Sequence, residues 1–125
     1  MQYTTLQDAA DHDELQILDF DEGSTEIWYQ RPELFGRVAG FAKDPDIEID
    51  INDLSKTHIL LGSVCEADPE RLYGLLQGER WSPNGEARDL IRSKGLRHTS
   101  MSVGDIVVNY QGTHIVDSVG FKTLG

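Results

Sequence analysis

Residues 98–125, with the sequence HTSMSVGDIVVNYQGTHIVDSVGFKTLG, hold the pattern that decides the fold we predict for this chain. Ile106–Val108 is a β-branched run of the kind that forms strands, and His114–Val116 is a second apolar segment. Gln111-Gly112 between them is a turn signal, and a two-residue loop there places Val108 opposite Ile115 and Val107 opposite Val116. The pattern therefore predicts an antiparallel hairpin with apolar cross-strand pairs on both faces.

Further strands are predicted upstream of this hairpin. Residues 46–51, DIEIDI, alternate strictly between acidic and apolar side chains, which is typical of a strand with one exposed face. Residues 57–64, THILLGSV, are more continuously apolar and fit a central strand that is buried on both faces. Residues 15–20 and 25–29 flank a turn signal at Asp21–Ser24 and predict another hairpin.

Helices are expected between these strands. Each candidate stretch begins at a proline or a capping side chain, carries apolar residues at helical spacing, and ends at a helix-stopping residue. The three stretches run from Pro32 to the stop at Lys43, from Asp68 to Gly78, and from Asn84 to Gly95.

Together these elements predict a single α+β domain over residues 1–125, with an antiparallel sheet, a C-terminal hairpin and two or three short helices. No repeat or linker divides the chain. No apolar run approaches the ~18 residues of a membrane helix, so we expect a soluble cytoplasmic protein.

One part of the chain resembles a known family. The run Ser100–Val107, SMSVGDIV, followed by Gly112, Val116, Gly120-Phe121 and Leu124, resembles the C-terminal signature of YodL-like domains. The resemblance covers about residues 96–125. Such domains occur in phage, plasmid and other mobile-element proteins and have no established catalytic residues. The resemblance therefore implies a mobile-element setting and a fold element, without a mechanism.

The net charge of -11 is concentrated in one half of the chain. Residues 1–57 carry 14 acidic and 4 basic side chains, whereas residues 58–125 carry 8 acidic and 7 basic ones. Such a field repels phosphate backbones and attracts basic surfaces, so a protein partner with a basic surface is favoured over direct nucleic-acid binding.

The DIEIDI segment, residues 46–51, supports a more specific expectation about how a basic partner is bound. On a strand, its alternate carboxylates lie ~6.6 Å apart in a straight ladder, which resembles the regular anions of a nucleic-acid backbone. A solvated outer strand face is the plainer interpretation of the same pattern. The predicted acidic binding face comprises Asp44, Asp46, Glu48, Asp50 and Asp53.

A basic surface in the second half provides an alternative. Four cations fall along the last predicted helix and its exit, where they also complement the helix dipole. As a binding surface, they favour a small PUA-like β-barrel that contacts nucleic-acid phosphates. The four residues are Arg88, Arg92, Lys94 and Arg97.

Possible catalytic side chains lie near the hairpin entry, at His98, Ser100 and Asp105. These residue types can form a nucleophilic triad, but no strained nucleophile elbow surrounds this serine. Hydrogen bonds in turns are the favoured role, and Gly104, Asp105 and Gly112 are predicted to be structural turn residues. We therefore expect no catalytic residues and no enzyme activity.

Metal and cofactor binding are not expected either. The four histidines never fall in a ligand spacing such as His-x-x-x-His, and no second cysteine accompanies Cys65. Cys65 follows an apolar run and is predicted to be a buried, reduced thiol.

These observations predict a non-catalytic accessory protein of a phage or mobile element that acts by binding another protein. In a more specific form of this hypothesis, the acidic face mimics nucleic acid and blocks a host enzyme that binds DNA or RNA. The alternative is the nucleic-acid-binding module with the basic surface.

Overall fold

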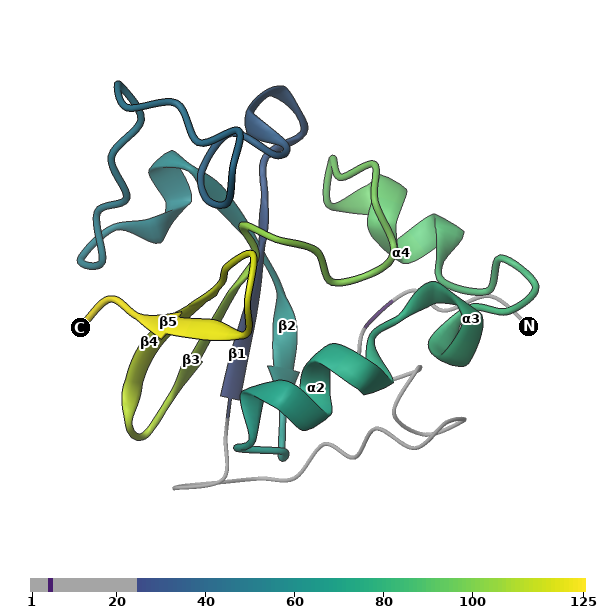
Figure 1. The fold of residues 1–125 in the computed structure, drawn as a ribbon. Coiled ribbons are helices and arrows are strands. Elements are labelled where there is room, and N and C mark those ends of the chain that lie inside the picture. The colour runs from purple at the N-terminus through teal and green to yellow at the C-terminus, as the bar shows by residue number, and fades with distance from the viewer. Residues whose placement is uncertain (1–4, 6–24) are drawn as a thin grey trace.

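The computed structural model describes Thr5 and residues 25–125, which form one antiparallel sheet and several short helices (Figure 1). The strands are β1 (Thr25–Gln30), β2 (His58–Val64), β3 (Ile106–Asn109), β4 (Gly112–Val116) and β5 (Phe121–Thr123). The helices are α2 (Pro69–Leu75), α3 (Gly78–Trp81) and α4 (Arg88–Ser93), with 3-10 turns at Pro32–Leu34 and Leu54–Lys56. The predicted α+β class is confirmed.

The strand order is β2-β1-β3-β4-β5, and every neighbouring pair is antiparallel. β2 was expected in the centre of the sheet, but it lies at one end of the described strands. It carries a bulge opposite the Ile27–Trp28 step of β1, where the pairing register shifts by one residue. Because β2 and β5 are the two ends of the described sheet, that sheet is open, unlike the barrel of the alternative hypothesis.

The predicted C-terminal hairpin is confirmed, but its register differs by two residues. Ile106 pairs with Ile115 and Val107 with His114, so the loop consists of Tyr110 and Gln111 rather than Gln111 and Gly112. The Asn109 side chain accepts a hydrogen bond from the Gln111 amide at 2.9 Å and so closes the turn one residue earlier. A shift of two residues keeps each side chain on its predicted face.

The three helices cover one face of the sheet. Leu72 of α2, Trp81 of α3 and Leu90 of α4 are fully buried against Ile27, Tyr29 and Val107. The predicted start of α2 is confirmed, because the Asp68 side chain accepts a hydrogen bond from the amide of Glu70 at 3.1 Å. α2 ends at Leu75, however, and Gly78, expected to stop it, begins α3.

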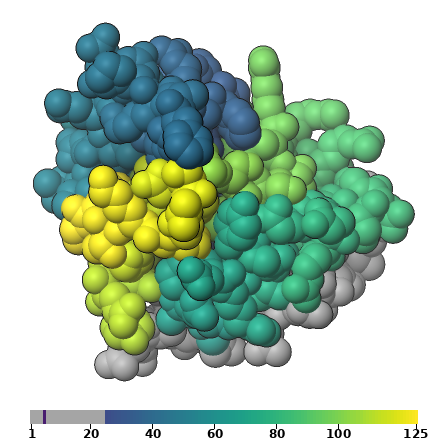
Figure 2. All heavy atoms as spheres, in the orientation of Figure 1, coloured from purple at the N-terminus to yellow at the C-terminus, as the bar shows by residue number. Residues whose placement is uncertain are grey.

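The segment 31–57 covers the opposite face of the sheet (Figure 1). Ala39 and Leu54 pack there on Ile106 and Ile115, and the four residues form a second buried cluster. Figure 2 shows this segment beside the C-terminal residues, which separate it from α2 on the visible face. The sheet is therefore buried on both faces, with an irregular segment in place of helices on the second.

The helix predicted from Pro32 to Lys43 is wrong. The chain forms one 3-10 turn, Pro32–Leu34, and then reverses direction at Gly36 and Gly40, whose φ angles are 77° and 78°. These left-handed conformations interrupt a right-handed helix. The side-chain oxygen of Gln30 accepts a hydrogen bond from the Gly36 amide at 2.9 Å, which gives this amide a partner outside any helix.

The strand predicted over residues 46–51 is also wrong, because this segment is irregular and joins no described strand. Asp44 accepts a hydrogen bond from the Asp46 amide through its side chain at 2.9 Å, and the backbone turns again where Asp53 donates to Asp50 at 3.0 Å. Side chains that satisfy nearby amides in this way compete with strand pairing. Ile49 is partly buried against the second cluster, whereas Ile51 is exposed, so only part of the apolar pattern serves the core.

The predicted hairpin of residues 15–20 with 25–29 falls partly outside the described residues, and only its second half, β1, is described. Cys65 is partly exposed rather than buried. Within residues 25–125, no helix has the length and apolar character required to cross a bilayer.

Candidate functional site

One feature with possible binding chemistry is a cleft of about 730 Å³, formed by α3, α4, the loop between them and the segment that follows α4. We call it the arginine cleft. It brings together side chains from two helices and one irregular segment. The lining residues are Gly78, Ser82, Gly85, Arg88, Ile91, Arg92, Gly95, Leu96, Arg97 and Thr99.

Three of the four cations of the predicted basic surface line this cleft. Arg88 and Arg92 are four residues apart on α4 and therefore share one face of the helix. Gly95, with a φ of 74°, ends the helix and reverses the chain, which places Arg97 at the same cavity. Lys94, the fourth predicted cation, does not line the cleft.

Two further lining residues, Ser82 and Gly85, belong to the loop between α3 and α4. Gly85 has a φ of 81°, and a Cβ atom added there would lie 2.9 Å from a terminal nitrogen of Arg88, so this guanidinium lies directly over the glycine. The hydroxyl oxygen of Ser82 accepts a hydrogen bond from the Ala87 amide at 2.9 Å. That bond leaves the hydroxyl hydrogen available to a ligand.

The floor of the cleft is fixed to the protein core through Thr99. Its carbonyl accepts hydrogen bonds from the hydroxyl of Tyr29 at 2.8 Å and from the indole nitrogen of Trp81 at 3.2 Å. Burial, reinforced by the charge of Asp105, raises the pKa of Tyr29 well above its ordinary value, so Tyr29 stays protonated as a donor. The cleft is therefore attached to rigid, fully buried aromatic side chains.

The electrostatics of the cleft are cationic although the whole chain is acidic. Arg88, Arg92 and Arg97 are exposed, and within residues 25–125 none of them forms a recorded ion pair. By contrast, Arg37 and Arg71, which lie elsewhere, pair with Asp44 and Glu66. The guanidinium groups at the cleft are thus available to an external anion.

The predicted acidic face is not arranged as a ladder, because its strand does not form. Asp44 pairs with Arg37 at 2.7 Å and Asp50 with Lys56 at 3.1 Å. The pKa values of Asp44 and Asp50 are lowered, first by backbone amides and then by these cations.

The remaining members of the acidic face, Asp46, Glu48 and Asp53, are exposed. Asp53 accepts a hydrogen bond from the hydroxyl of Ser55 within its own turn. The carboxylates of Asp44, Asp50 and Asp53 are therefore near one another in sequence but make separate local contacts.

The candidate triad is not assembled. His98 contacts Asp105, with its Nε2 atom 2.9 Å from one carboxylate oxygen and 3.1 Å from the other. The hydroxyl oxygen of Ser100 instead accepts a hydrogen bond from the Gly78 amide at 2.7 Å. His98 is further enclosed by Tyr29, stacked at 4.5 Å, and Phe35, edge-on at 4.7 Å. These contacts favour a structural role for the histidine.

Asp105 has a larger structural role than the predicted turn. Its carboxylate is fully buried and accepts hydrogen bonds from the amide and side chain of Gln30 at 2.9 and 3.0 Å, and from the Ser102 amide at 2.8 Å. Gly104 precedes it with a φ of 104°. Gly112, which was predicted to be a turn residue, is instead the first residue of β4 and pairs with Asn109. Its φ is 132°, and the carbonyl of Gly125 lies close to where a Cβ atom would stand.

His58 also contacts the turn that contains Gly104 and Asp105. Its Nε2 atom donates to the Gly104 carbonyl at 2.7 Å, so its Nδ1 atom accepts from the Thr57 hydroxyl at 2.7 Å. Burial lowers the pKa of His58. Within residues 25–125, no cluster of three or more acidic, histidine or cysteine side chains is arranged to hold a metal ion.

Comparisons with protein-family models, curated proteins and solved structures found no match. The sequence reasoning found the cleft arginines but missed the residues that complete the cavity, namely Gly78, Ser82, Gly85, Gly95 and Thr99. The glycine turns that flank a basic helix are the signal that points to them.

Proposed function

We propose that this protein is a non-catalytic binding protein whose arginine cleft receives a phosphate-bearing ligand. The observation that carries this proposal is the convergence of Arg88, Arg92 and Arg97 on one cavity, where none of them has a carboxylate partner among residues 25–125. The predicted basic surface supports the same function, although the described sheet is open rather than a barrel.

Phosphate suits this cavity because its several oxygens can accept hydrogen bonds from more than one guanidinium group. A guanidinium presents paired N–H donors that match two phosphate oxygens, and such charge-assisted bonds are among the strongest in proteins. Exposed glycine backbone at Gly95 permits an anion to approach closely. The Ser82 hydroxyl adds a neutral donor to the lining of the cleft.

The cavity favours a small or flexible phosphate carrier over duplex DNA. Its volume of about 730 Å³ is that of a small-ligand site. A long duplex would also meet the field of a chain with a net charge of -11. A nucleotide or a short single strand brings one or a few phosphates into the cleft with less of that repulsion.

The experiment compares matched arginine variants. Binding of labelled single-stranded DNA and RNA, a mononucleotide and inorganic phosphate is measured at low salt for the unmodified protein and for Arg88→Gln/Arg92→Gln. The control is Arg37→Gln/Arg71→Gln, which changes the net charge equally but removes two arginines outside the cleft.

We expect the cleft variant to lose at least about tenfold in affinity, since two phosphate contacts of roughly 1 kcal/mol each disappear. The control should lose much less. Equal losses in both variants would mean that binding follows net charge, and no binding by the unmodified protein at low salt would end the proposal. The affinities for the different ligands show whether the cleft prefers inorganic phosphate, a mononucleotide or a single strand.

A mobile-element setting and cytoplasmic location remain predictions from the sequence. So does binding of the acidic half to a basic protein, although the irregular course of residues 46–51 removes the regular spacing on which imitation of nucleic acid depended.

A further inference from the structure

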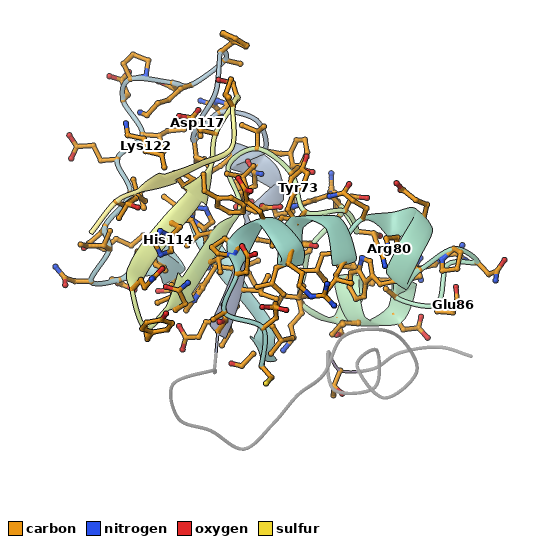
Figure 3. The ribbon with its side chains drawn as sticks, turned by 60° about the horizontal axis from the view of Figure 1, so that its bottom comes forward. Tyr73, Arg80, Glu86, His114, Asp117 and Lys122 are labelled. Carbon is orange, nitrogen blue, oxygen red and sulfur yellow. The ribbon has the colours of Figure 1, made fainter. Side chains whose placement is uncertain are left out.

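A second cavity, of about 240 Å³, lies between α2 and the turn that joins β4 to β5. We call it the aromatic pocket. Figure 3 shows two of its residues, Tyr73 on α2 and Asp117 at the end of β4. The residues that matter for its chemistry are Glu70, Tyr73, Val116, Asp117 and Phe121.

Two aromatic rings form walls that meet at a right angle. The planes of Tyr73 and Phe121 are 89° apart, and their ring centroids are separated by 6.5 Å. The face of an aromatic ring carries negative electrostatic potential and attracts cations, most strongly where water is excluded. Val116 extends the apolar lining, so the pocket suits an alkyl chain with a positively charged end.

The two carboxylates of the pocket, Glu70 and Asp117, form no recorded ion pair within residues 25–125. Asp117 accepts one hydrogen bond, from the Ser118 amide at 2.8 Å, which leaves its other oxygen for a ligand.

Neighbouring cations of the same protein do not fill the pocket. Arg71 pairs with Glu66 at 2.7 Å. Lys122 follows Phe121 on β5 and therefore points to the opposite face of that strand. The pocket thus combines an apolar interior with negative charge that has no internal counter-ion in the described part of the chain.

We propose that the aromatic pocket binds the side chain of a lysine on a polypeptide partner. Four methylene groups contact the apolar walls, and the compact ammonium group lies between the aromatic faces and the carboxylates. The net charge of -11 favours approach of a basic polypeptide. This inference is independent of phosphate binding, because the pocket shares no lining residue with the arginine cleft.

The experiment is an NMR titration of the full-length, isotope-labelled protein with a short capped peptide that contains one lysine. The matched peptide carries norleucine, which keeps the alkyl chain and lacks the charge, and free butylammonium is a third probe. We expect the lysine peptide to shift the resonances of Tyr73, Gly120 and Phe121 in a saturable way. The norleucine peptide should bind at least about tenfold more weakly.

Paired variants then test the carboxylates. Glu70→Gln/Asp117→Asn keeps side-chain size and should weaken lysine-peptide binding by about tenfold, if each partly exposed ion pair is worth roughly 0.5–1 kcal/mol. Asp46→Asn/Glu48→Gln makes the same charge change at exposed residues outside the pocket and should leave binding nearly unchanged. A thermal melt of each variant confirms folding.

Equal binding of the norleucine and lysine peptides would overturn the proposal in favour of an apolar site. Butylammonium that binds while the lysine peptide does not would overturn it in favour of a free amine. Equal weakening by both double variants would show that net charge attracts the peptide without a specific pocket.

Discussion

The Nε2 atom of His98 lies 2.9 Å from a carboxylate oxygen of Asp105, and this contact joins the arginine cleft to the C-terminal hairpin. His98 stands in the chain between Arg97 and Thr99, which both line the cleft. Asp105 directly precedes β3 and also binds Gln30 at the end of β1. The carboxylate therefore fixes one wall of the cleft relative to two central strands.

Asp105→Ala should destabilise the fold strongly. The substitution leaves the Gln30 and Ser102 amides and the His98 ring without their buried acceptor. Loss of one partner from a buried charged network costs about 3–5 kcal/mol. Chemical denaturation measures the change, with Asp89→Ala, an exposed carboxylate on α4, as the control. A loss below about 1 kcal/mol for Asp105→Ala would contradict its central role.

Gly104→Ala should cost more than Gly36→Ala, although both glycines have left-handed backbone, with φ values of 104° and 77°. A Cβ atom at residue 104 would lie 2.5 Å from the Gln30 side-chain oxygen and 2.7 Å from Val38, whereas residue 36 has nothing within 4 Å. Both variants pay a backbone cost of ~1–2 kcal/mol, and only Gly104→Ala adds a steric one. Equal melting temperatures for the two variants would refute this difference.

Stability should fall as the pH is lowered through about 6.5, because burial lowers the pKa of His58 in the folded state. Below that pH the unfolded chain binds a proton at His58 more readily than the folded protein does, which favours unfolding. Above that pH His58 is largely neutral in both states, so its protonation no longer lowers the free energy of unfolding. The charged and titratable neighbours of His58 are Asp105, Arg31 and His98.

His58→Gln tests this linkage, since glutamine keeps a donor for the Gly104 carbonyl and does not titrate. Urea unfolding at several pH values between 5 and 7.5 gives the free energy of unfolding. Between pH 7.5 and pH 5 this free energy should fall less for the variant than for the unmodified protein. The other histidines are common to both proteins, so the difference between the two curves isolates His58. If the unfolding free energies of the two proteins depend on pH in the same way, protonation of His58 does not affect folding.

Local patterns identified much of the fold. The β-branched runs on either side of the Gln111-Gly112 turn signal predicted the hairpin, and the Asp68-Pro69 pair predicted the start of α2. In both cases the deciding interactions lie within a few residues of each other. The two-residue register difference arose from the side chain of Asn109, which local apolar matching did not consider.

The errors of prediction come from side chains that bind backbone amides a few residues away, which the apolar pattern does not include. Residues 46–51 have the alternation of a strand, yet Asp44 and Asp50 bind amides two residues on, and the segment pairs with no described strand. The predicted helix after Pro32 fails because Gly36 finds a partner in Gln30 and adopts left-handed backbone.

The cleft was only half predictable for a different reason, because it depends on a contact between distant residues. Arg88, Arg92 and Arg97 are visible as cations near a helix end, but their cavity exists because Thr99 is held by Tyr29 and Trp81. Tyr29 lies 70 residues away from Thr99 in the chain. No local pattern encodes such a contact.

The most direct test of the account is the position of a phosphate ligand on the protein. NMR titration with a short single-stranded oligonucleotide and with a mononucleotide follows the side-chain Nε resonances of Arg88, Arg92 and Arg97 at low salt. The account predicts that these three shift together and saturably, while those of Arg37 and Arg71 do not. Shifts spread over all arginines, or absent from the three in the cleft, would contradict it.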